Sequence, residues 1–181
     1  MRKACLHRLT KLLTPTSVNI VGTVVPPYPQ GFDSFEGACI PVTVNPVNAC
    51  KYTIGILQTS RDDRRVGIFA GVYDRLEQDR VRWKVTDYIA YPDVPDGHTF
   101  APVGCQLNGA EDEAVIAVLE SSRDPGTDFA EFGQAVWARK LNVATGKLVQ
   151  IKPSSVQCLA EAMAEGYYGG SADHTGNGRA P

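Results

Sequence analysis

The sequence predicts a mainly β fold, either an antiparallel β-sandwich or a curved, barrel-like sheet, with one C-terminal α-helix. Seventeen glycines and twelve prolines among 181 residues favour short strands joined by many turns. Apolar residues recur with a period of two through the middle of the chain, as in half-buried strands. Only one segment joins strong helix formers to a start and a stop signal. We therefore expect about six to eight strands between Cys39 and Ile151.

The first 38 residues have the composition of a leader and a linker, and the sequence leaves open whether they belong to the fold. Polar residues interrupt the apolar run that a secretory signal needs, and the basic, acid-free composition also suits a transit peptide or a misassigned start. Three prolines and two glycines in residues 26–37 favour a linker or a surface loop. The main domain is then expected over residues 39–166. Four bases precede the first acid: Arg2, Lys3, Arg8 and Lys11.

Segments 51–58, 65–73 and 80–89 alternate between apolar and polar residues. This pattern predicts strands with one face on a core and the other face in water. Trp83 falls on the apolar side of its segment and Trp137 has apolar neighbours, so we expect both in the core. Residues 114–119 are apolar on both faces, which predicts a central strand covered on both sides, with a short buried helix as the alternative.

Two further elements follow toward the C-terminus. Residues 134–151 predict a hairpin that turns at Ala144-Thr145-Gly146, where Gly146 can adopt the left-handed conformation. Ser154 or Ser155 can cap a helix that runs from Val156 to Glu165 and stops at Gly166. Residues 167–181 are glycine-rich without apolar periodicity, which is typical of a disordered tail.

Five cysteines without a Cys-x-x-Cys spacing argue against a zinc ribbon or a thioredoxin-type site. Four remain if a leader containing Cys5 is removed. Two disulfides would then suit an oxidising compartment, with Cys39–Cys50 and Cys105–Cys158 as the preferred pairing. Free, buried cysteines are the equally weighted alternative. The location is periplasmic or secreted if residues 1–30 are a processed leader, and cytoplasmic otherwise.

The charge pattern argues against nucleic-acid binding. The net charge is −2, and acids interrupt the basic cluster of residues 61–84. We likewise expect no membrane span, because the chain has no apolar run of about 18 residues. The residues that form the basic cluster, with two aromatic residues among them, are Arg61, Arg64, Arg65, Tyr73, Arg75, Arg80, Arg82, Trp83 and Lys84.

One loop brings carboxylates and an imidazole close together in the sequence. Asp93, Asp96 and His98 lie on a segment restricted by two prolines, so they are candidate ligands of a hard cation or an acid/base pair. Turn formation explains the same residues, since Pro-Asp and Asp-Gly favour turns. The acidic stretch Asn108–Glu113 lacks the spacing of a calcium loop and predicts a solvated hairpin tip.

These observations favour a non-enzymatic binding or accessory module for an unknown protein or small ligand, without a cofactor. The nucleotide-binding and nucleophile-elbow motifs are missing from the sequence. The alternative is a small metal-dependent or acid/base enzyme that uses Asp93, Asp96 and His98.

Overall fold

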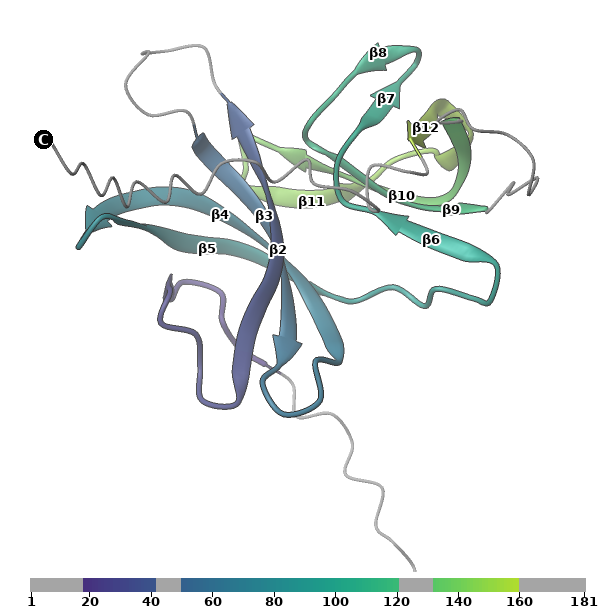
Figure 1. The fold of residues 1–181 in the computed structure, drawn as a ribbon. Helices are drawn as coiled ribbons and strands as arrows, with labels where there is room; N and C mark the ends of the chain where they lie inside the picture. Colours follow the sequence, from purple (N-terminus) through teal and green to yellow (C-terminus); the bar gives the residue numbers. More distant parts are fainter. Residues whose placement is uncertain (1–17, 42–49, 121–131, 160–181) are drawn as a thin grey trace, which may run out of the picture.

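The computed structural model describes residues 18–41, 50–120 and 132–159, which form two curved antiparallel sheets (Figure 1). The first sheet has five strands in the order β1-β5-β4-β3-β2. The second has seven, in the order β6-β9-β10-β12-β7-β8 with β11 paired to β10. The predicted mainly β fold is confirmed. None of the described residues form a helix that is long and apolar enough to cross a membrane.

The strands of the first sheet are β1 (Val24–Val25), β2 (Phe32–Pro41), β3 (Cys50–Thr59), β4 (Arg65–Glu77) and β5 (Arg80–Ala90). The strands of the second sheet are β6 (His98–Ala101), β7 (Cys105–Leu107), β8 (Ala110–Glu111), β9 (Val115–Glu120), β10 (Phe132–Asn142), β11 (Lys147–Gln150) and β12 (Val156–Leu159). The predicted hairpin is confirmed by β10 and β11, which pair across a turn where Gly146 has a φ of 69°.

Strand β9 is covered on both faces, as its sequence predicts. Ile116 and Val118 point into a core between the two sheets, where they meet Ile54, Ile56 and Ile68 of the first sheet. The alternate residues of β9 face a second core inside the second sheet, formed with Cys105, Ala135, Ala138, Val156 and Cys158. Because successive side chains of a strand point to opposite faces, a run without polar residues requires two apolar environments.

The first sheet differs from the prediction, because its outer face is also covered. Leu57, Phe69 and Val85 point away from the second sheet and pack against Ile20 and Val25. The prediction of one wet face is therefore wrong for the middle of β3 and β4, where residues 53–57 and 67–71 are buried. Ile20 and Val25 belong to residues 1–38, which the sequence left open as a leader or linker outside the fold.

Residues 18–41 are tied to the first sheet by backbone pairing. The Gly22 N–H donates to the Val85 carbonyl at 2.8 Å, and the Val85 N–H donates to the Thr23 carbonyl at 2.9 Å. Tyr28 packs against Phe69 with 6.2 Å between ring centroids, and burial there raises the pKa of the Tyr28 hydroxyl. Nine strands, β3 to β11, lie wholly between Cys39 and Ile151, where six to eight were expected, and β1, β2 and β12 bring the described residues to twelve strands.

The predicted C-terminal helix is not seen. Pro153–Ser155 form a single 3-10 turn, and Val156–Leu159 form β12, which pairs with both β10 and β7. Val156 and Cys158 are buried in the second core while the residues between and beside them face outward. Burial on alternate residues thus outweighs local helix propensity. Residues 160–165 of the predicted helix and the expected tail 167–181 lie outside the described residues.

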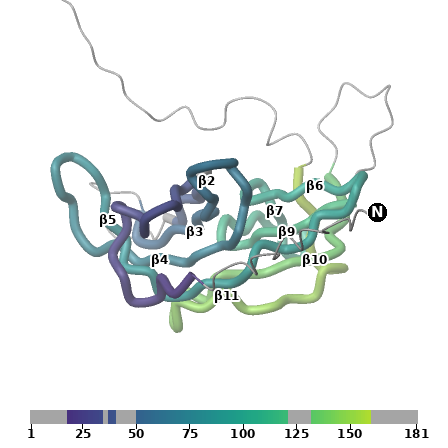
Figure 2. Tube along the Cα trace, turned by 90° about the horizontal axis from the view of Figure 1, so that it is seen from below, coloured from purple at the N-terminus to yellow at the C-terminus, as the bar shows by residue number. Residues whose placement is uncertain are grey.

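The two sheets join along β5 and β11. A bulge at Thr86 interrupts the β4–β5 register, so that Asp87 and Thr86 both reach β11. The Asp87 carboxylate accepts the Leu148 N–H at 2.8 Å and lies 3.3 Å from the Lys147 ammonium. The Thr86 hydroxyl donates to the Gly146 carbonyl at 2.8 Å, and its side chain leaves no space for a Cβ at Gly146. Figure 2 shows the two sheets side by side.

Both predicted cysteine pairs are present as disulfides. Cys39–Cys50 joins the ends of β2 and β3, and Cys105–Cys158 links β7 to β12 at paired positions. Their Cα atoms are 5.2 Å and 4.0 Å apart. Each bridge therefore holds together two adjacent strands of one sheet.

Replacing Cys105 and Cys158 by Ala should destabilise the protein more than replacing Cys39 and Cys50. Loop-closure entropy gives about 4 kcal/mol for a separation of 53 residues and about 3 kcal/mol for 11. Cys105 and Cys158 are also buried, so their loss removes core contacts as well. Urea unfolding of the two double variants measures the difference, and an equal or reversed loss would contradict it.

Asp87→Ala should lower the free energy of unfolding by about 1–3 kcal/mol, because the Leu148 N–H loses its acceptor at the join between the sheets. Asp74→Ala is the matched control, since Asp74 pairs only with Arg75 on the surface and such pairs contribute about 0–1 kcal/mol. Urea denaturation of both variants tests this. Equal losses would mean that Asp87 does not join the sheets.

Candidate functional site

The loop with Asp93 and Asp96 leads into β6, which begins at His98. These three side chains are not grouped as metal ligands. Asp93 and Asp96 are exposed, and His98 is half-buried. The His98 Nδ1 atom lies 3.3 Å from the backbone carbonyl of Asp96 and so has a turn contact rather than a carboxylate partner. Among the described residues, no group of three His, Cys, Asp or Glu is placed to hold a metal ion.

A pocket of about 390 Å³ lies between β2 of the first sheet and the β7–β8 hairpin of the second sheet. One wall is Gly37, Ala38 and Cys39 of β2, the last strand of the first sheet. The other wall comes from Cys105 and Gln106 of β7 with the adjoining end of β8. The C-terminal half of β2 lies at the same end of the molecule as the β7–β8 hairpin (Figure 1). The pocket therefore lies between an edge strand of the first sheet and a hairpin of the second sheet.

Apolar groups close the pocket between these walls. Val103 precedes β7, Leu159 ends β12, and Phe132 begins β10 with 42% of its side chain exposed. Each disulfide contributes one cysteine to the lining, Cys39 and Cys105. The pocket walls are therefore cross-linked to the strands behind them.

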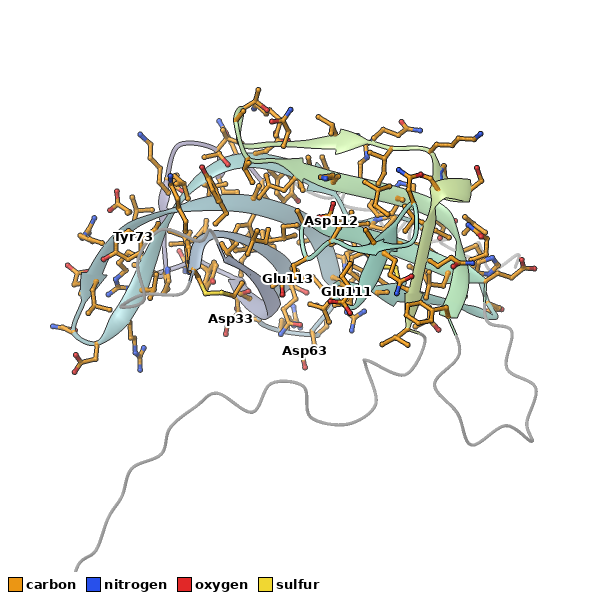
Figure 3. All side chains as sticks on the ribbon, turned by 90° about the horizontal axis from the view of Figure 1, so that it is seen from above. Asp33, Asp63, Tyr73, Glu111, Asp112 and Glu113 are labelled. Carbon is orange, nitrogen blue, oxygen red and sulfur yellow. A yellow bond between two sulfur atoms is a disulfide. The ribbon has the colours of Figure 1, made fainter. Side chains whose placement is uncertain are left out.

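The charged residues in the described part of the lining are acidic: Glu111, Asp112 and Glu113 (Figure 3). Asp112 is held within the fold, because its carboxylate lies 2.5 Å from the Lys140 ammonium and accepts the Ala114 N–H at 3.1 Å. Glu111 and Glu113 are exposed, and neither forms an ion pair with a described residue. Asp112 therefore fixes the segment, and its two neighbours supply negative charge at the pocket.

Sequence reasoning placed these acids on a hairpin but missed the pocket. The hairpin is present, with Asn108 and Gly109 at its turn in the left-handed conformation. The Asn-Gly pair was the available signal for the hairpin. The opposite wall could not be found this way, because Gly37 to Cys39 belong to a segment more than 60 residues earlier.

The predicted placement of both tryptophans is confirmed. Trp83 packs against the outer core of the first sheet, and Trp137 packs against the core between the sheets. Two of the arginines in the basic cluster contact neighbouring groups of the protein. Arg82 contacts Glu77 at 2.7 Å and the Pro26 carbonyl at 2.6 Å, and Arg75 contacts Asp74 at 2.5 Å.

The described residues define a class of structure, a two-sheet antiparallel β protein with two disulfides and a pocket at its open side. Comparison with known proteins found no match: no family model, no curated protein and no solved structure is similar to this chain.

Asp112→Ala should lower the free energy of unfolding by about 1–3 kcal/mol, because it removes the acceptor of the Ala114 N–H and the partner of Lys140. Glu113→Ala, one position later and exposed, should change it by no more than about 0.5 kcal/mol. Urea unfolding separates the two roles. Equal stability of the two variants would show that Asp112 does not anchor the segment.

Proposed function

We propose that this protein is a non-enzymatic binding module, and that its ligand carries a positive charge on a small apolar body. The observation that carries the proposal is the pocket between β2 and the β7–β8 hairpin. Its volume of about 390 Å³ is within the range of small-molecule and side-chain binding sites. Its described lining combines apolar walls with acidic residues and includes no basic residue.

Charge complementarity supports a cationic ligand. Glu111 and Glu113 lie on either side of Asp112, whose own charge is compensated by Lys140. An ammonium or guanidinium group between these two glutamates would be attracted by both. Phe132 adds an exposed aromatic ring to the lining, and the face of such a ring also attracts cations. Glu111 and Glu113 would repel an anionic ligand.

The two disulfides support a location in an oxidising compartment, either periplasmic or secreted. Disulfides persist outside the reducing cytosol and are rare within it. Since one cysteine of each pair lines the pocket, oxidation also stabilises the walls of the proposed site. An oxidising compartment therefore favours the proposed binding role, because it keeps the walls of the pocket cross-linked.

Phenethylamine, which joins an ammonium group to a small apolar ring, should bind in the pocket. NMR titration of the isotopically labelled protein should shift the amides of Gly37, Gln106 and Glu111 first. The neutral analogue 2-phenylethanol should bind about tenfold more weakly, which corresponds to about 1.4 kcal/mol for the lost charge interaction.

A double variant Glu111→Gln/Glu113→Gln should weaken phenethylamine binding by about tenfold without changing the fold. The matched control is Asp93→Asn/Asp96→Asn, which removes the same charge from the exposed loop before β6. Equal binding of the amine and the alcohol would refute the proposal. A loss confined to the Asp93/Asp96 variant would instead place the site on that loop.

A further inference from the structure

We infer that the ligand of this pocket is an extended segment of a partner protein that carries Lys or Arg. It would add to the outer edge of β2 as an extra strand and place its basic side chain between Glu111 and Glu113. This inference rests on the proposed function and names the class of ligand. It is carried by the position of the pocket against an edge of β2 that no described strand pairs with.

Strand β2 ends the first sheet, and among the strands of the described ranges it pairs only with β3. The Ala38 carbonyl accepts the Thr53 hydroxyl of β3 at 3.0 Å, so the backbone of Ala38 faces inward. Backbone groups of successive residues in an antiparallel strand point alternately to its two sides. Gly37 and Cys39 therefore direct their N–H and C=O groups outward, and both residues line the pocket.

The usable edge is short and accessible. The register of β2 against β3 is regular from Gly37 to Ile40 and is interrupted on both sides of that stretch. Such irregularities limit indiscriminate strand pairing at a sheet edge. Gly37 has no side chain and the Ala38 methyl group is buried, so no side chain of these two residues blocks the edge. An added strand would thus be restricted to about four residues.

Side chains of the added strand would meet the opposite wall of the pocket. Backbone hydrogen bonds supply affinity in this kind of recognition, and pockets beside the edge select alternate side chains. Here the groups opposite β2 are Gln106 and the carboxylates of Glu111 and Glu113. A Lys or Arg in the added strand places its alkyl stem along Phe132 and its charge at the glutamates. A neutral or acidic segment lacks this match.

The test is fluorescence anisotropy of the full-length protein with a dye-labelled peptide, Val-Lys-Val-Lys-Val. Two N-methylated versions separate backbone from side-chain binding: one is methylated at the Val residues and the other at the Lys residues. Methylation on the side facing β2 should weaken binding by about tenfold, while the other version should bind as the parent does. A Val-Gln-Val-Gln-Val peptide should also lose about tenfold.

The outcomes distinguish this inference from the proposed function. If phenethylamine binds but the peptide does not, or if both methylated peptides bind equally, strand addition is wrong and the cation site stands. If neither the amine nor the peptide binds, both proposals fail.

If replacing Arg2, Lys3, Arg8 and Lys11 by Gln tightens peptide binding by about tenfold, the chain's own N-terminal segment is the occupant. Self-association without peptide in sedimentation would assign the edge to a second copy.

Discussion

Strand β9 is apolar on both faces, and most of the architecture follows from the need to cover both of them. Ile116 and Val118 require the first sheet on one side, and Val115, Ala117 and Leu119 require a layer on the other. The second sheet provides that layer by turning back on itself, so that β12 and β7 pack beneath β9. The inner strands of the first sheet have the same two-sided burial and need residues 18–32 as a cover. A buried strand needs apolar contacts on both of its faces, and the described residues therefore form three hydrophobic cores.

Among the described residues, hydrogen bonds join the two sheets at β5 and β11, and the pocket lies between β2 and the β7–β8 hairpin. Asp87 connects β5 to β11 through charged and backbone hydrogen bonds, so the sheets cannot separate there. On the other side, β2 and the β7–β8 hairpin have no equivalent connection in the described part of the chain. A complete barrel would have no unpaired edges. This partial closure leaves a strand edge beside acidic groups, which is what the proposed binding mode requires.

The alternation of apolar residues was sufficient to predict the strands and the hairpin that turns at Gly146. The preferred cysteine pairing is the one present, and each bridge joins strands that are neighbours in the sheet. The structures of two segments could not be predicted from local sequence patterns. Residues 26–37 have the composition of a linker. They pack on the outer face of the first sheet because that face is apolar and would otherwise be exposed to water. Residues 156–159 have helix formers nearby, yet pairing with β7 and β10 decides their conformation. The pocket depends on contacts between distant segments, which a one-dimensional pattern does not contain.

The pairing of β7 with β12 has a consequence for the order of events during synthesis. Every strand of the first sheet lies before residue 91, so this sheet and the Cys39–Cys50 bridge can form while the rest of the chain is still being made. Cys105 must wait for Cys158, 53 residues later, to leave the ribosome or the translocation channel. During that interval Cys105 is a free thiol on a half-built sheet, open to exchange with other cysteines. Correct maturation therefore depends on how the rate of chain elongation compares with the rate of thiol oxidation.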